Sequence, residues 1–410
     1  MIEFPKNFLW GAATSAHQVE GNNTNSDWWE WEKNGGSAEA SREACRHYEL
    51  YGSDFDLAKS LGHNAHRLSV EWARIEPQEG VFSEKELRHY RDVLSALRER
   101  SLEPVVTLHH FTNPIWFSRM GGWENKCSGS YFLRYTQRVV EALGDQVRYW
   151  VTINEPLIYV YHSYLLGIWP PQKKSLWKAW QVEGNLAAAH IKAYRLIHDI
   201  YQQKNFNPPS VSIAKNVQAF IPCRPTLRNR FAAYLRGRWF NYNFVERLLA
   251  AKALDFIGIN YYSRNLVEVR SWWPAHLGMD TCKDPSHHLK KNSLGWEIYP
   301  RGLYDLLIRF KQYNRPLMIT ENGICIDDDN IRWEYIRGHL KSVHRAMQEG
   351  ARVLGYLYWS LLDNYEWDKG FLPRFGLVEV DYNSYGRRPR ESARKFAAVC
   401  TTGRLEDGAD

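Results

Sequence analysis

The chain has 410 residues, of which 44% are hydrophobic and 14% aromatic, with 53 basic and 46 acidic residues giving a net charge of +7. The length allows either two domains or one large α/β barrel. The basic residues form short stretches without a nucleic-acid-binding motif, so we expect no nucleic-acid partner. No run of about eighteen apolar residues occurs, so we expect no membrane span.

The N-terminus and the cysteines favour a cytoplasmic protein. Residues 1–5 lack the basic and apolar regions that begin a signal peptide. The six cysteines are scattered without a CxxC pair, so we expect reduced thiols and neither a disulfide framework nor a zinc site. His287 and His288 are adjacent, but no carboxylate motif converges on them. We therefore predict that the protein needs no metal and no cofactor.

Segments with strand-like and helix-like patterns alternate along the chain without a linker. The predicted strands are 8–16, 65–72, 103–111, 147–155, 211–221, 254–262, 316–324 and 353–364. The predicted helices are 53–61, 84–100, 131–143, 186–203, 228–251, 302–313, 331–348 and 390–399. Eight alternations predict a single (β/α)8 TIM barrel over residues 1–410, with 401–410 as a flexible tail. A doubly wound sheet is less well supported, because no glycine-rich phosphate loop follows an early strand.

Most of the predicted strands end in polar or aromatic side chains. The ends are His17-Gln18, Glu71-Trp72, His109-His110, Asn154-Glu155, Asn260-Tyr261-Tyr262, Glu321-Asn322 and Asp363-Asn364. In a (β/α)8 barrel, active sites lie at the C-terminal ends of the strands. We therefore expect these side chains to converge on one site.

Two of these ends carry a lone glutamate beside an asparagine, in the strings 152–156 (TINEP) and 319–323 (ITENG). A carboxylate at the end of a buried strand is costly to desolvate, and structure alone rarely requires one. Two of them, Glu155 and Glu321, match the acid and the nucleophile that cleave a glycosidic bond. The structural alternative for each is a buried salt bridge.

Over nearly its full length the chain resembles glycoside hydrolase family 1, the retaining β-glucosidase and β-galactosidase family. The resemblance rests on both glutamate strings and on residues 4–14, 255–262 and 359–367. It implies that Glu155 is the general acid/base and Glu321 the nucleophile, with the carboxyl groups about 5–5.5 Å apart. Arg67 would keep Glu321 ionised, and the pKa of Glu155 would be raised.

The resemblance also implies a set of sugar-binding residues. Gln18 would bind the O3/O4 side of the sugar, His110 the 3-hydroxyl and Asn154 the 2-hydroxyl. Asn260 and Tyr262 would flank the nucleophile. The predicted set is completed by Trp359 as the stacking floor, by Glu366 at O4 and O6 with Trp367 beside it, and by Phe375. An anionic Glu366 would repel a 6-phosphate, so we expect neutral sugars.

Three departures from the family pattern affect specificity. Phe111 stands where most members have a tryptophan that can donate to O3, and this predicts tolerance of glucosides, galactosides, fucosides and mannosides. Trp169 and Trp296 predict an apolar aglycone side, with further tryptophans near the mouth at Trp29, Trp177, Trp272 and Trp273. Segment 228–254 is shorter than in many relatives, which predicts a more open cleft.

These observations predict a retaining exo-β-glycosidase that acts on small β-glycosides or oligosaccharides and transfers sugars to alcohols as a side reaction. Two alternatives remain open: a non-hydrolytic sugar-binding or sensor protein on the same barrel, and an enzyme that works mainly as a transglycosidase or on glycolipid-like substrates. Because Glu155 is present, a myrosinase-type enzyme is excluded. The sequence does not determine the oligomeric state.

Overall fold

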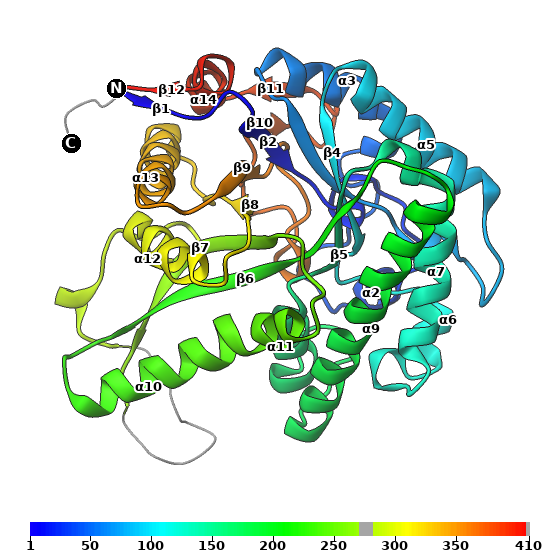
Figure 1. Ribbon diagram of the computed structural model, residues 1–410, viewed down its shortest axis with the longest axis horizontal. Helices are drawn as coiled ribbons and strands as arrows, with labels where there is room; N and C mark the ends of the chain where they lie inside the picture. Colours follow the sequence, from blue (N-terminus) through cyan, green and yellow to red (C-terminus); the bar gives the residue numbers. More distant parts are fainter. Residues whose placement is uncertain (270–281, 407–410) are drawn as a thin grey trace.

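The computed structural model describes residues 1–269 and 282–406, and its centre is a closed barrel of eight parallel strands (Figure 1). Each strand pairs with its neighbours in chain order, and β9 closes the barrel on β2. The strands are β2 (Leu9–Ala13), β3 (Ala65–Ser69), β4 (Glu103–His109), β5 (Tyr149–Asn154), β6 (Ser210–Pro222), β7 (Ile257–Val267), β8 (Leu317–Asn322) and β9 (Val353–Trp359). The predicted (β/α)8 barrel is confirmed.

Helices surround the barrel and cover the outer faces of its strands (Figure 1). The main ones are α3 (His47–Ser60), α5 (Glu84–Glu99), α7 (Ser128–Leu143), α9 (Leu176–Gln203), α10 (Leu227–Gly237), α11 (Phe244–Ala250), α12 (Pro300–Lys311), α13 (Asp329–Gln348) and α14 (Glu391–Thr402). Helix α9 begins ten residues before its predicted start. The Ser175 side chain accepts a hydrogen bond from the backbone N–H of Lys178 and caps this early turn.

Short elements fill the loops after the strands. They are α1 (Ala16–Val19), α2 (Asp27–Lys33), α4 (Trp72–Ile75), α6 (Ile115–Arg119) and α8 (Pro156–Val160). The predicted helix at 228–251 is divided, because a wider π-helical turn at Arg238–Asn243 separates α10 from α11. Strands β10 (Val378–Val380) and β11 (Arg387–Pro389) form a separate antiparallel pair.

The predicted flexible tail at 401–410 starts too early. Helix α14 continues to Thr402, and β12 (Arg404–Leu405) pairs antiparallel with β1 (Ile2–Glu3). Leu405 is buried, so apolar burial holds this segment against the N-terminus in addition to the strand pairing.

The expectation that all cysteines are reduced thiols is wrong for two of them. Cys223 follows β6 and forms a disulfide with Cys282, with 5.6 Å between the Cα atoms. A sequence separation of 59 positions hides the pairing in the sequence. Strands β6 and β7 are neighbours up to Pro222 and Val267, and this adjacency brings the two chain segments together. Cys45, Cys127, Cys325 and Cys400 are free.

Within residues 1–269 and 282–406, no helix is both long and apolar enough to cross a membrane. The large core is instead packed around and inside the barrel, and its largest fully buried side chains include Trp28, Trp72, Trp123 and Trp150. Trp150 donates its indole N–H to the Tyr201 hydroxyl at 2.7 Å, which satisfies the polar atom that burial would otherwise penalise.

The close approach of β2 and β3 requires a glycine. A Cβ atom on Gly11 would lie 1.9 Å from the Ala65 carbonyl oxygen, which belongs to rigid backbone. We expect Gly11→Ala to destabilise the barrel by about 1–3 kcal/mol through overpacking. Guanidinium unfolding monitored by tryptophan fluorescence measures the change.

Gly52→Ala is the matched control, since a Cβ atom there meets nothing within 4 Å and the residue lies inside α3. This change should be neutral or stabilising by about 0.5–1 kcal/mol. Equal midpoints for the two variants would contradict the steric explanation.

Candidate active site

A cleft of about 470 Å³ opens at the C-terminal ends of the barrel strands. Most of the residues predicted to be catalytic or to bind sugar line it: His110, Asn154, Glu155, Tyr262, Glu321, Trp359, Glu366, Trp367 and Phe375. Gln18, Arg67 and Asn260 do not line the cleft. They are fully buried and lie behind the residues that form its wall. Both tryptophans predicted for the aglycone side, Trp169 and Trp296, also line the cleft.

Glu155 lies directly after β5, at the junction with α8. Its backbone is left-handed, with φ +42°, and Pro156 begins the helix. Such a conformation is strained for a residue other than glycine and often occurs at functional sites. The carboxylate accepts hydrogen bonds from the Asn260 amide at 2.8 Å and the Asn216 amide at 3.1 Å. Burial, assisted by the negative charge of Glu321, raises the pKa of Glu155 to about 7.

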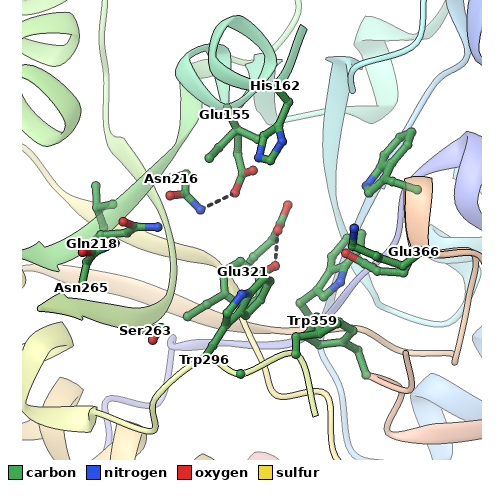
Figure 2. A pocket seen from close by; sticks show the side chains of 18 of the residues that line it. Glu155, His162, Asn216, Gln218, Ser263, Asn265, Trp296, Glu321, Trp359 and Glu366 are labelled. Carbon is green, nitrogen blue, oxygen red and sulfur yellow. Dashed lines mark hydrogen bonds between the residues drawn. The ribbon is translucent and has the colours of Figure 1, made fainter. Parts of the chain in front are cut away.

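Glu321 is the penultimate residue of β8 and points toward Glu155 across the cleft (Figure 2). Its Oε1 accepts a hydrogen bond from the Arg67 guanidinium at 2.5 Å, and its Oε2 accepts one from the Tyr262 hydroxyl at 2.5 Å. Burial raises the pKa of Glu321, whereas Arg67 and Tyr262 act in the opposite direction. The two carboxyl groups therefore have different hydrogen-bond donors. Glu321 pairs with a cationic guanidinium and a phenol, whereas Glu155 is bound by neutral amides.

A network of side chains fixes both glutamates. Asn154 accepts a hydrogen bond from Arg67 at 2.7 Å and another from Asn260 at 3.2 Å, and its amide lies 3.2 Å from His110 Nε2. The Thr320 hydroxyl donates to Asn260 Oδ1 at 2.6 Å, and so orients the amide that reaches Glu155. His110 Nδ1 is buried and has no hydrogen-bond partner among the described residues.

Gln18 lies on α1 behind Glu366. Its amide donates to the Tyr365 carbonyl at 2.7 Å and to Asn364 at 3.1 Å, and it lies 3.5 Å from Glu366 Oε2. Burial, with the nearby charge of Glu321, raises the pKa of Glu366 to about 8. Burial therefore works against the anionic form of Glu366 that the sequence analysis expects.

Aromatic rings form much of the cleft wall. His110 stacks on Trp359 with 6.0 Å between ring centroids, and Phe111 packs 5.1 Å from Trp169. Trp296, which is 39% exposed, lies 5.7 Å from the Tyr262 ring at the other side. The tryptophans predicted near the mouth at Trp29 and Trp177 do not line the cleft, and Trp272 and Trp273 lie outside the described residues.

Sequence reasoning missed the contribution of β6. Asn216 lines the cleft and holds Glu155, and its neighbour Lys215 is fully buried. The Lys215 ammonium donates to the Asn216 carbonyl and lies 4.3 Å from the Phe240 ring centroid. The sequence did carry a signal for this contribution. Lys215 and Asn216 are adjacent polar residues inside predicted strand 211–221, which is the only predicted strand for which no polar end was identified. This strand extends well beyond the barrel rim, so its functional residues lie in its middle.

Three potential metal ligands come together within the described part of the chain: Cys223, Cys282 and His287. None of them lines the cleft. Glu155 and Glu321 themselves accept hydrogen bonds from amide, guanidinium and phenol donors. Their arrangement is thus suited to proton transfer and nucleophilic attack by the protein's own groups.

Two opposed, buried glutamates at the C-terminal end of a (β/α)8 barrel are the arrangement of a glycoside hydrolase. The family model described as Glycosyl hydrolase family 1 matches residues 1–250 and 245–404. The chain belongs to this family, as its sequence motifs predict.

Proteins of known name are similar to this chain in both sequence and structure. A 1,4-beta-D-glucan glucohydrolase from Thermotoga neapolitana is 30% identical, over 99% of this chain and 100% of that protein. A beta-galactosidase from Pyrococcus woesei is 30% identical, over 95% of each chain. The solved structure of a beta-glycosidase from Pyrococcus horikoshii is 40% identical and superposes with a TM-score of 0.93, covering 99% of this chain and 96% of that one.

The buried charge of Lys215 generates a prediction about the pH profile. Burial lowers the pKa of Lys215 to about 7, and its positive form favours ionised Glu155. Replacing it in Lys215→Met should therefore raise the pKa of Glu155. The basic limb of the kcat/KM profile, where the acid loses its proton, should move to higher pH by about one unit or less.

Lys192→Met, an exposed change on α9, is the control and should leave both limbs in place. An unchanged basic limb in Lys215→Met, with activity retained, would show that this lysine carries no charge that Glu155 senses.

Proposed function

We propose that the protein is a retaining exo-β-glycosidase that releases a terminal neutral sugar from small β-glycosides or oligosaccharides. The observation that carries the proposal is the unequal support of the two opposed glutamates. Glu321 is paired with a cation and a phenol, as a nucleophile that must stay ionised requires. Glu155 has a pKa of about 7, as an acid that must hold a proton at neutral pH requires.

In the first step Glu321 attacks the anomeric carbon, and the bond from that carbon to the leaving oxygen breaks. Glu155 gives its proton to that oxygen, so the aglycone leaves as an alcohol and a glycosyl ester of Glu321 remains. In the second step Glu155, now ionised, takes a proton from water, and the water oxygen displaces Glu321. Two displacements at one carbon retain its configuration. An alcohol in place of water gives transglycosylation.

The wall of the cleft supports an apolar aglycone. Ile168, Trp169, Leu266, Leu294 and Trp296 line it together with the sugar-binding residues. Apolar and aromatic linings favour aryl or alkyl groups through burial of apolar surface. Use of glycolipid-like substrates, and a cytoplasmic location, stay predictions from the sequence.

The two glutamate roles are separable by experiment. We expect Glu155→Ala to lose about 10²–10⁴-fold in kcat/KM on aryl glycosides with poor leaving groups, because they need the acid. With a dinitrophenyl leaving group the first step should persist, and added azide should give a β-glycosyl azide. Glu321→Ala should lose turnover of both substrates, with azide giving the α-glycosyl azide.

Product anomers are assigned by proton NMR. The assignment would be overturned if Glu155→Ala gave the α-azide, or if Glu321→Ala kept its activity. Wild-type methanolysis followed in the same way tests retention directly, since an inverting enzyme would give the α-methyl glycoside.

Sugar selectivity is tested with p-nitrophenyl β-glycosides of glucose, galactose, fucose, mannose and 6-phosphoglucose. We expect turnover of several neutral sugars and little or none of the phosphate. Phe111→Trp adds an indole N–H beside the site and should widen the kcat/KM differences among epimers, by about 10-fold or more where the new bond forms. Phe111→Leu is the control, because it adds no donor. The same ranking in all three proteins would refute the role assigned to Phe111.

A further inference from the structure

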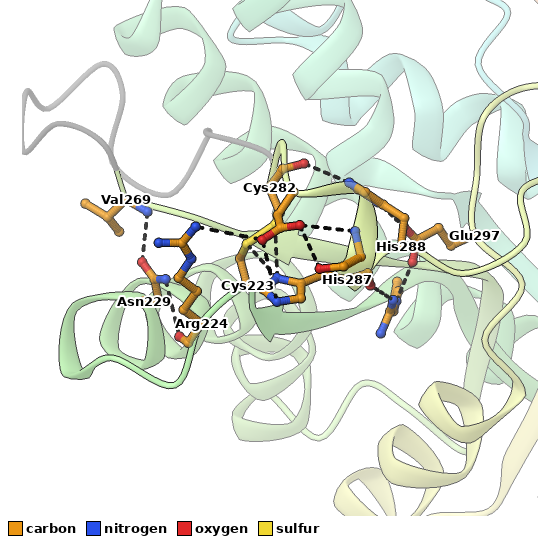
Figure 3. Close-up of a disulfide and its surroundings, with 11 residues drawn as sticks. Cys223, Arg224, Asn229, Val269, Cys282, His287, His288 and Glu297 are labelled. Atoms are coloured by element: carbon orange, nitrogen blue, oxygen red, sulfur yellow. Dashed lines mark hydrogen bonds and ion pairs between the residues drawn. A yellow bond between two sulfur atoms is a disulfide. The ribbon is translucent and has the colours of Figure 1, made fainter.

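A second cluster of reactive side chains lies outside the cleft, where β6 ends (Figure 3). His287, in a short 3-10 turn (Pro285–His287), directs its Nδ1 at both sulfur atoms of the Cys223–Cys282 pair. The distances are 3.4 Å to the sulfur of Cys223 and 3.6 Å to that of Cys282. Both cysteines are buried, with 7% and 3% of their surface exposed.

These distances fit a tetrahedral metal site. Zinc binds thiolate sulfur at about 2.3 Å and imidazole nitrogen at about 2.0–2.1 Å, so two such ligands on one ion lie about 3.5 Å apart. All three candidate ligand atoms lie within 4.8 Å of one another. The ring is thus already placed as a third ligand for two thiolates, and only the sulfur atoms need to separate.

The surroundings of the imidazole support the same conclusion. Its other nitrogen, Nε2, faces an Asp284 carboxylate oxygen at 3.9 Å, and Asp284 is held by the Ser286 hydroxyl at 2.7 Å. Metal-binding histidines commonly present their second nitrogen to a carboxylate, which fixes the ring orientation. Arg264 donates to the His287 carbonyl at 2.7 Å and fixes the backbone of the turn.

We propose that in the reduced protein Cys223, Cys282 and His287 bind one zinc ion, with water as the fourth ligand. The disulfide is the oxidised alternative of the same site. A thiol reductant that itself becomes a disulfide supplies two electrons and two protons, and converts the cystine to two thiols. Zinc binding then releases both protons as the thiolates coordinate the ion. This contradicts the sequence-based expectation that the protein has no metal site.

The site links two segments that border the substrate cleft. Cys223 follows β6, and His288, beside His287, lies against Glu297, which lines the cleft and pairs with Arg264. Either a disulfide or a zinc ion would join these segments, so the aglycone side keeps its cross-link in both redox conditions. The aglycone side of the cleft would therefore stay cross-linked in a reducing as well as in an oxidising environment.

The test uses the full-length protein, reduced with a phosphine and then desalted. After addition of Zn²⁺ and gel filtration, elemental analysis should find about one zinc per chain. Replacement by Co²⁺ should give thiolate-to-cobalt charge-transfer absorption and the visible bands of a tetrahedral ion. Protein oxidised to the disulfide should bind none. Hydrolysis of an aryl glycoside by each sample shows that the barrel is folded.

Variants separate the site from chance binding by a free thiol. Cys223→Ser and His287→Ala should lose zinc retention, and Asp284→Asn should weaken the affinity by about 10–100-fold. Cys127→Ser is the control, because Cys127 is an exposed free cysteine that should not contribute.

The proposal is overturned if reduced wild-type protein retains no zinc, if cobalt shows no thiolate absorption, or if zinc survives in Cys223→Ser and His287→Ala. If Cys127→Ser were the only variant to lose zinc, the ion would bind at the exposed Cys127 and not at the proposed site. None of these changes touches Glu155 or Glu321, so a failed metal site and a failed glycosidase assignment give different results.

Discussion

The active site depends on a buried cation. Arg67 is fully buried on β3, and it donates to Glu321 at 2.5 Å and to Asn154 at 2.7 Å. Removing one member of such a pair leaves an unpaired buried charge, which typically costs about 3–5 kcal/mol. The guanidinium therefore stabilises the ionised form of Glu321 and, through Asn154, positions the amide network that reaches Glu155. Arg67 thus affects both the charge of Glu321 and the position of the amide groups that bind Glu155.

The barrel makes this electrostatic arrangement possible. Parallel strands direct their C-terminal ends to one rim, so residues far apart in sequence share a site in which their side chains are buried. Within it the burial penalty acts on all three carboxyl groups and raises the pKa values of Glu155 and Glu366 to about 7 and about 8. What distinguishes Glu321 is its partners, Arg67 and Tyr262, and not its depth. The difference between the Glu155 and Glu321 carboxyl groups thus follows from hydrogen-bond donors placed by neighbouring strands.

The active-site cleft and the cluster of Cys223, Cys282 and His287 are arranged differently. In the cleft, polar groups are aimed at a space that a substrate can fill, with aromatic rings as walls. At the end of β6, two sulfur atoms and an imidazole are aimed at each other, and the structure closes that space with a covalent bond. The cysteine cluster lies on the segments after β6 and β7, and β6 and the segment after β7 also supply Asn216 and Glu297 to the lining of the cleft.

The sequence by itself predicted the barrel and pointed to Glu155 and Glu321 as a matched pair, because strand and helix periods are local and the motifs around these two glutamates are specific. It did not reveal Asn216, Lys215 or the Cys223–Cys282 contact, since each depends on which strands become neighbours and on how far β6 extends. It also assigned Glu366 a charge that burial disfavours. Tertiary structure decided these points because desolvation and partner distances, which set pKa values and cross-links, exist only once distant segments are packed together.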